Sequence, residues 1–210
     1  PEAGPVIARI AAEQGVPLVP VDPALLPGGV DDGVAPYQRQ NLATAATVVR
    51  VLRETGWASV PDAALRHGLR HGRPPGRFQV VPRVDRTLVL DVAHNPDGAR
   101  ALALALGRRF PGSPVVAVVG ASRNHDPEAF LRALAPALTS VVATEATFRP
   151  VPAALVAEAA ARAGVPARRV VPVAEAVRAA LETTPRGGIC LVTGSFFVVG
   201  ETPRELVAPG

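Results

Sequence analysis

The sequence has no lysine and no methionine among its 210 residues, and only one cysteine, one tryptophan and one tyrosine. Without lysine the chain cannot form a Schiff base, and it cannot supply the phosphate-binding lysine of a P-loop or a carbamylated lysine. A single cysteine excludes a disulfide scaffold and a cysteine-based zinc site. Aromatic residues make up 4% of the chain, so its core must be built from Ala, Val and Leu.

Long hydrophobic runs are also missing. No uncharged apolar run reaches the ~18 residues of a transmembrane helix, and no basic-then-apolar leader opens the chain. We therefore expect no membrane partner and a cytoplasmic location. The chain begins at Pro1-Glu2 without a methionine, which predicts a fragment of a longer protein whose N-terminal part is missing. With 48% hydrophobic and 19% charged residues the chain can bury a core, which excludes a wholly disordered protein.

The positive charge is carried by arginine alone. The 22 basic residues against 18 acidic ones give a net charge of +4 and a pI of about 10.8. A high pI suggests nucleic-acid binding, which needs basic residues gathered on one surface. The arginines are scattered, with doublets only at Arg108-Arg109 and Arg168-Arg169. We expect no nucleic-acid partner and attribute the composition to GC-rich coding.

The first third of the sequence is predominantly helical. Apolar residues at helical spacing predict helices over residues 5–15, 37–54 and 60–70. The run VPLVPV at 16–21 predicts a short strand. The run HGRPPG at 71–76 breaks regular structure, so we place a domain boundary there, with one domain over 1–75 and another over 76–210.

After this boundary, short apolar segments alternate with amphipathic ones. The predicted strands are 78–83, 87–92, 115–119, 140–143, 169–173 and 189–193. The predicted helices are 99–110, 127–138, 152–163 and 174–182. This order predicts an α/β fold, Rossmann-like, with a mostly parallel sheet and helices on both faces. Residues 196–199 predict a final strand, antiparallel because Gly194-Ser195 leaves no room for a crossover helix.

Polar residues follow one of the predicted strands directly. Ligands of open α/β sheets bind beyond the carboxyl ends of the strands. Asp91 closes a strand, and His94 and Asn95 lead into a helix that begins near Pro96. A carboxylate, an imidazole and an amide this close together predict a ligand site. The alternative is that Asp91 and Asn95 only cap the turn and that His94 is exposed.

Two more strand ends carry polar groups. Gly120 and the run SRNHD at 122–126 follow one strand, and Thr193-Gly194-Ser195 follows another. Their hydroxyls and amides would face a ligand at the same edge of the sheet. The alternatives are an ordinary loop with Asp126 as a helix cap and an ordinary turn into the last strand.

Other catalytic motifs are absent from the sequence. There is no GxxxxGK[ST], no GxGxxG and no GxSxG, which argues against a self-contained phosphate loop and a serine hydrolase. His67 and His71 are four residues apart but have no acidic residue nearby, so we expect no metal site there. Cys190 lies in an apolar run and is expected to be a buried core thiol.

The run LDVAHNPD at 90–97 resembles the C-terminal-domain motif of the Mur ligase superfamily, and its neighbourhood is most similar to folylpolyglutamate synthase and dihydrofolate synthase. Three other stretches support the resemblance in the expected order: YQRQN at 37–41, PGRF at 75–78, and TGS at 193–195 with its continuation to Glu201. The sequence AHNP at 93–96 and the motif TGS at 193–195 favour this folate branch over Mur-type ligases that add an amino acid to a cell-wall precursor.

The resemblance implies an ADP-forming ligase that joins L-glutamate to a folate or to dihydropteroate. ATP phosphorylates the substrate carboxylate, and the glutamate amino group attacks the acyl phosphate. The family's P-loop and Mg²⁺ ligands lie in a central ATP-binding α/β domain. Residues 1–75 would be the tail of that domain, and 76–210 the C-terminal ligase domain. The implied partners are small molecules only (ATP, L-glutamate and the folate substrate), for a monomer that is inactive as this isolated fragment.

Five residues in the matching motifs correspond to positions of the family's ligand site. The resemblance implies that Asn41 lies near adenine, that Arg77 reaches the nucleotide phosphates and that Asp91 contacts ribose. His94 and Ser195 match positions that line the same cleft, and they are the expected catalytic residues. An arginine fork suits phosphate, and a carboxylate can accept two hydrogen bonds from ribose hydroxyls. No metal ligand is expected within the chain.

The sequence departs from the family pattern at two places. His125 stands where relatives often have a lysine, so a permanent cation is not expected there. The segment from 21 to 37 is short for the strands of the family's central domain. A non-catalytic nucleotide-binding α/β module remains as an alternative, and a Gly-Lys-Ser or Gly-Lys-Thr loop upstream of Pro1 would favour the enzyme.

Overall fold

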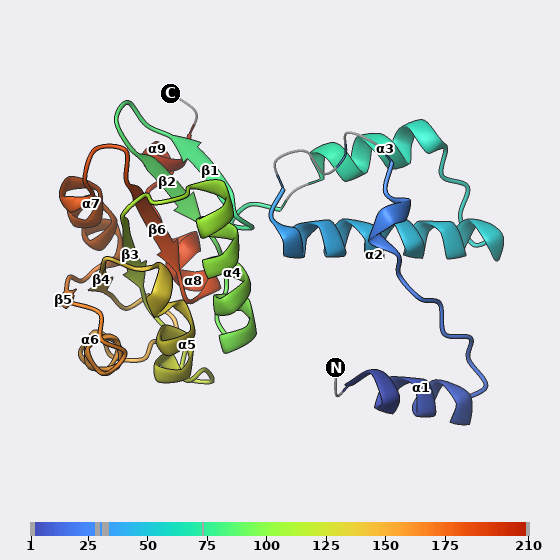
Figure 1. Cartoon of the computed structure of the whole chain (residues 1–210), viewed down its shortest axis with the longest axis horizontal. Coiled ribbons are helices and arrows are strands. Elements are labelled where there is room, and N and C mark those ends of the chain that lie inside the picture. The colour runs from blue at the N-terminus through green and yellow to red at the C-terminus, as the bar shows by residue number, and fades with distance from the viewer. Residues whose placement is uncertain (1–2, 28–29, 31–33, 73, 209–210) are drawn as a thin grey trace. The chain divides into compact units, whose positions relative to one another are not determined.

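A computed structural model describes the chain apart from residues 1–2, 28–29, 31–33, 73 and 209–210 (Figure 1). The chain folds into two compact units, residues 1–73 and 74–210. None of the helices in the described parts is long and apolar enough to cross a membrane.

The first unit is made of helices. They are α1 (Ala3–Glu13), the 3₁₀ turn η1 (Pro23–Leu25), α2 (Pro36–Glu54) and α3 (Asp62–His71). The three predicted helices are confirmed. The strand predicted at 16–21 is wrong, because this segment is extended but pairs with no strand among the described residues. Pro17 and Pro20 lack the backbone N–H that a sheet ladder requires, which explains the error.

Few side chains of the first unit are buried. Ala43 of α2 and Leu69 of α3 are 2% and 4% exposed. An ion pair of 2.7 Å between the Arg53 guanidinium and the Asp62 carboxylate joins the end of α2 to the start of α3. In contrast, the apolar side chains Val6, Ile7 and Ile10 of α1 are about half exposed. This unit therefore has only a small core of its own.

The second unit contains a six-stranded sheet. Its strands are β1 (Gln79–Pro82), β2 (Thr87–Leu90), β3 (Val115–Val119), β4 (Ser140–Ala143), β5 (Ala167–Arg169) and β6 (Ile189–Thr193). Its helices are α4 (Pro96–Arg109), α5 (Pro127–Leu134), η2 (Ala135–Ala137), α6 (Ala153–Arg162), α7 (Val173–Thr183), α8 (Phe196–Gly200) and α9 (Arg204–Val207). The spatial order is β1-β2-β6-β3-β4-β5, and only β1 runs antiparallel to its neighbour. The predicted α/β fold with a mostly parallel sheet is confirmed.

Two strand predictions in this unit need correction. The segment 196–199 forms the helix α8, because the Ser195 hydroxyl accepts a hydrogen bond from Phe197 N and so begins a helical turn. Its run of Phe and Val residues favours a strand by propensity alone. The fifth strand lies at 167–169, two residues before the predicted start, and Val173 already belongs to α7.

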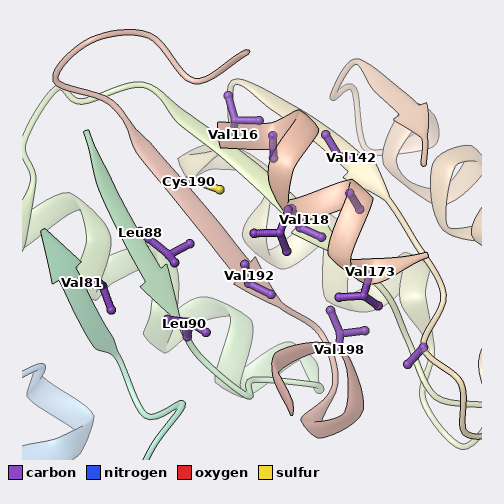
Figure 2. Packing of buried hydrophobic residues seen from close by; sticks show 14 residues of the cluster. Val81, Leu88, Leu90, Val116, Val118, Val142, Val173, Cys190, Val192 and Val198 are labelled. Carbon is purple, nitrogen blue, oxygen red and sulfur yellow. The ribbon is translucent and has the colours of Figure 1, made fainter. Parts of the chain in front are cut away.

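Helices cover both faces of the sheet. Side chains of alternate strand residues point to opposite faces. Leu90, Val118 and Val192 are at most 2% exposed and join a core cluster with Val173 of α7 and Val198 of α8 (Figure 2). The opposite set is equally buried, for example Val89, Ala117 and Leu191. With α7 on one face, this second set faces the layer of α4, α5 and α6, whose inner residues Leu102, Leu131 and Val156 are fully buried.

Cys190 of β6 lies within the first cluster and is 0% exposed, as predicted. Burial raises the pKa of its thiol to about 12, and a hydrogen bond with Thr184 opposes this rise. Because the thiolate is the reactive form, Cys190 serves as a core residue.

Two glycines allow the strands to converge at their carboxyl ends. Gly194 has φ +95°, and a Cβ on it would lie 2.3 Å from the carbonyl oxygen of Gly120. A Cβ on Gly120 would lie 2.7 Å from Val198 Cγ2 and 2.8 Å from the carbonyl oxygen of Thr144. No other residue type fits either position without displacing backbone.

We predict that Gly194→Ala destabilises the protein far more than Gly164→Ala. Gly164 also has a positive φ, +78°, but its Cβ position is open, so alanine there should cost only about 1 kcal/mol of conformational strain. The overlap at Gly194 should add about 2 kcal/mol. Urea unfolding followed by far-UV circular dichroism measures both values, because the sole tryptophan, Trp57, lies in the first unit. Equal losses in the two variants would show that no close contact exists at Gly194.

Candidate active site

The loops that follow β2, β3, β4 and β6 meet at the carboxyl edge of the sheet. Gly194 N donates to the carbonyl of Ala93 at 3.0 Å, which joins the β6 loop to the β2 loop. Val151 N donates to the carbonyl of Ala121 at 2.8 Å and Arg123 N to that of Arg149 at 3.0 Å, which joins the β4 loop to the β3 loop. These bonds join the four loops in two pairs, and a bond of 3.4 Å from Gly120 N to the Thr193 carbonyl links the two pairs.

These loops enclose a cavity of about 170 Å³, called here the anion pocket. Its lining residues are His94, Ser122, Arg123, Asn124, His125, Phe148, Arg149, Ser195, Phe196 and Phe197. The ten include two arginines and no carboxylate. Neither guanidinium has an ion pair with an acidic side chain among the described residues, since Arg123 bonds a carbonyl and Arg149 lies 5.5 Å from the Phe148 ring centroid. The pocket therefore suits an anionic ligand.

Two histidines lie together in the anion pocket. The ring centroids of His94 and His125 are 4.5 Å apart. His94 Nδ1 is 2.9 Å from the carbonyl oxygen of Val92, which can only accept, so Nδ1 carries the proton and Nε2 of the neutral ring keeps its lone pair. Partial burial, and secondly the nearby His94, lower the pKa of His125 below 6.5. His125 therefore contributes little positive charge at neutral pH, and Nε2 of a neutral His94 ring can accept a proton.

Ser195 is 3% exposed and belongs to the same pocket. Its Oγ accepts from Phe197 N at 3.1 Å, and it shares a hydrogen bond of 2.9 Å with Ser122 Oγ. The backbone bond makes Ser195 the N-cap of α8, and the bond to Ser122 joins the loops after β6 and β3. Ser195 therefore lines the pocket, as expected for residues 193–195, and its hydroxyl also has a structural role as a helix cap and a link between two loops.

Asp91 follows β2 and is 3% exposed. Its Oδ2 accepts from Phe78 N at 2.8 Å, and its Oδ1 accepts from Ala93 N at 2.9 Å. The carboxylate thus bonds the backbone before β1 and the backbone before His94. Asn95 caps α4 through a bond of 2.8 Å from Gly98 N, as predicted.

Arg77 lies just before β1, and its side chain is exposed. Its guanidinium carbon is 5.4 Å from the centroid of the Phe196 ring. The same ring is 5.7 Å from the His94 ring centroid. The structure therefore places Arg77 and His94 against the same Phe196 ring, and His94 and Ser195 in the same pocket. Asp91 is buried and bonds the backbone next to Arg77 and next to His94. Asn41 is an exposed residue of α2 in the other unit.

Sequence reasoning missed Phe148, Arg149 and Phe196. Arg149 and Phe148 come from the loop after β4, and the rule that ligands bind beyond the carboxyl ends of the strands applies to this loop equally. Arg149 has φ +44°, which is uncommon for a non-glycine residue and marks this loop as constrained. Phe196 was hidden by the incorrect strand at 196–199.

No set of three or more His, Cys, Asp or Glu side chains in the described parts of the chain could hold a metal ion.

Comparison with known proteins gives a consistent result. The family described as Mur ligase, glutamate ligase domain, matches residues 76–196, which is more than half of the chain. A probable bifunctional folylpolyglutamate synthase/dihydropteroate synthase of Halobacterium salinarum is 34% identical over 79% of the chain. The folylpolyglutamate synthase/dihydrofolate synthase of Yersinia pestis, solved with AMPPNP and a Mn ion, is 34% identical over 75% of the chain with a TM-score of 0.65. An enzyme of the same description, solved with Mn, AMPPNP and L-glutamate bound, gives the same values.

These matches confirm the resemblance to the Mur ligase superfamily and to its folate branch. The chain spans 20% of the Halobacterium protein and 37% of each of the two solved chains.

We predict that His125 titrates below pH 6.5 and that His94→Gln raises its pKa part of the way back. Burial is the larger cause of the lowered pKa and is retained in the variant, so the pKa should stay below 6.5. Because the folded-state pKa is lowered, neutral His125 stabilises the fold above pH 6.5, and this contribution is lost as the pH falls through the folded pKa. Carbon-detected NMR of the imidazole Cε1 measures the midpoint. A midpoint above 6.5 in the unaltered protein would contradict the buried geometry.

Proposed function

Because the chain belongs to the Mur ligase family, through its glutamate ligase domain, we propose that it is part of an ATP-dependent ligase that adds L-glutamate to a folate or to dihydropteroate. The observation that carries the proposal is the anion pocket, whose cationic and neutral-histidine lining lies on the family-matched domain. Residues 1–75 would be the tail of the central ATP-binding domain, and 76–210 the ligase domain. Its substrates are small water-soluble molecules, which supports a cytoplasmic enzyme.

In the proposed reaction, the substrate carboxylate attacks the γ-phosphorus of ATP and releases ADP. The resulting acyl phosphate is attacked by the α-amino nitrogen of glutamate. The new C–N bond replaces the C–O bond to phosphate, which leaves as inorganic phosphate, and the amine loses a proton. This sequence needs a site for a dicarboxylate, a proton acceptor and cations near the nucleotide phosphates.

The anion pocket would hold L-glutamate. Arg123 and Arg149 stay charged at all relevant pH values and can each form paired hydrogen bonds to a carboxylate. The hydroxyls of Ser122 and Ser195 supply further hydrogen-bonding groups at the pocket wall. The absence of acidic side chains from its lining leaves nothing to repel two carboxylates.

His94 would accept the proton that the attacking amine releases. Its Nδ1–H is fixed by the Val92 carbonyl at 2.9 Å, so Nε2 is the free acceptor of the neutral ring. The hydrogen bond also limits rotation of the ring, which preserves the direction of that lone pair.

The nucleotide would be bound by the remaining matched residues. We assign Asn41 to the adenine, Arg77 to the phosphates and Asp91 to the neighbourhood of the ribose, as the family motif implies. The exposed position of Arg77 beside Phe196 supports its role, since a guanidinium suits the geometry and charge of a phosphate. We propose that the reaction of the whole protein also requires a divalent metal ion.

We predict that L-glutamate binds to the anion pocket of this chain and that Arg149→Gln weakens the binding about 10-fold. The substitution removes a charge-assisted hydrogen bond worth roughly 1.5–3 kcal/mol. Amide NMR titrations should show shifts at Ser122, Ser195 and His94 with L-glutamate and none with L-lysine. Arg132→Gln, an exposed arginine of α5, is the matched control. Equal shifts with both amino acids would remove the support for a glutamate site.

We also predict that the 210 residues alone do not ligate glutamate. The sequence has no GxxxxGK[ST] loop and no lysine to hold the β- and γ-phosphates of ATP. A coupled assay of ADP release with ATP, Mg²⁺, L-glutamate and dihydropteroate or tetrahydrofolate tests this. ADP release that requires both the folate and glutamate would show that the chain needs no separate P-loop.

A further inference from the structure

The backbone that carries Arg77 is held in an uncommon conformation. Gly76 has φ +71°, and a Cβ on it would lie 2.8 Å from Val199 Cγ1. Phe78 has φ +48°, a value that bulky side chains rarely adopt. Such a residue costs about 1–3 kcal/mol and persists only where its surroundings enforce it. The segment 76–78 is therefore fixed by other groups.

One of these groups is the carboxylate of Asp91. Its bond of 2.8 Å from Phe78 N is buried and joins residues that are thirteen positions apart in the chain. The neighbouring bond from Val92 N to the Gly76 carbonyl, 2.9 Å, ties the same two segments together. A buried charge-assisted bond is stronger than a neutral one, so Asp91 is well suited to hold Phe78 in its strained conformation.

The second group is the Phe196 ring, which receives the Arg77 side chain. The guanidinium carbon is 5.4 Å from the ring centroid, within the range of a cation–π contact. Phe196 also lines both the anion pocket and an adjacent apolar cavity of about 440 Å³ that Gly76 and Val92 border. Phe196 is 53% exposed, so core packing alone does not account for its position.

We propose that Asp91 and Phe196 are positioning residues for Arg77. Asp91 fixes the backbone that directly follows Arg77, and Phe196 fixes where the guanidinium lies. The ligand that this arrangement serves is the phosphate chain of a nucleotide, so the inference rests on the proposed function. Asp91 would then affect nucleotide binding in two ways: by contacting the ribose, and by positioning Arg77 for the phosphates.

The two effects of Asp91 differ in which ligand they touch. A contact with ribose affects adenosine and ADP equally, because both contain the ribose. An effect through Arg77 acts on ADP alone, because adenosine has no phosphate. Asp91 is the residue assigned to the ribose, so the removal of the Phe196 ring should change ADP binding only.

The first experiment uses the ligand-free chain. Asp91→Asn should lower the hydrogen-exchange protection of the Phe78 amide at least 10-fold and cancel the ring-current shift of the Arg77 side-chain protons. Asp97→Asn is the matched control, because Asp97 is an exposed aspartate six residues further on, with 92% of its side chain accessible. Unchanged Phe78 protection in Asp91→Asn, or no ring-current shift of Arg77 in the unaltered protein, overturns the proposal.

The second experiment measures dissociation constants for ADP and adenosine by calorimetry. Phe196→Leu, an exposed position that should not disturb folding, is expected to weaken ADP about 5-fold and to leave adenosine unchanged. Asp91→Asn should weaken ADP more than adenosine, and the double variant with Arg77→Ala should bind ADP more weakly than Arg77→Ala alone only by the factor that Asp91→Asn shows for adenosine. Additive losses, or equal losses for both ligands, overturn the proposal. If the unaltered chain binds no ADP, the nucleotide assignment fails and the ligand-free experiment alone decides the positioning role.

Discussion

The close approach of two backbones, at Gly120 and Gly194, is the constraint on which the site depends. It allows the β3 and β6 loops to meet, with only 2.3 Å between a Cβ position on Gly194 and the Gly120 carbonyl oxygen. The Ser122–Ser195 hydrogen bond joins the same two loops, and the Gly194–Ala93 hydrogen bond joins the β6 loop to the β2 loop. A side chain at either glycine would separate the loops and open the anion pocket.

Local signals in the sequence predicted much of the second unit. Asn95 and Asp126 cap their helices, which is the alternative that the sequence offers for each, because a cap needs only its own side chain and the next few backbone amides. β3, β4 and β6 have the predicted bounds, since buried parallel strands appear as short continuous apolar runs. The strands predicted at 16–21 and 196–199 are wrong although both segments are rich in β-favouring side chains. In the first, prolines lack the N–H groups that strand pairing needs, and in the second, Ser195 caps a helix.

The site was predictable only where its residues follow a strand in the sequence. Asp91, His94 and Ser195 could be found in this way, and the family motif added Arg77 and Asn41. The contacts between them could not be found, because they join distant segments: Phe78 N to Asp91, and Arg77 to Phe196. The positive φ of Phe78 has no sequence signal at all, since the conformation is imposed by its partners.

The absence of lysine gives the anion pocket a clear division of roles. A lysine changes its charge when it is buried, but an arginine stays charged, so Arg123 and Arg149 keep the positive charge of the pocket constant with pH. Partial burial, and secondly the His94 ring 4.5 Å away, lower the pKa of His125. In the proposed reaction, the fixed cations would select the anion while the neutral imidazole of His94 would take a proton. A protonated lysine at position 125 would instead add a further positive charge beside His94.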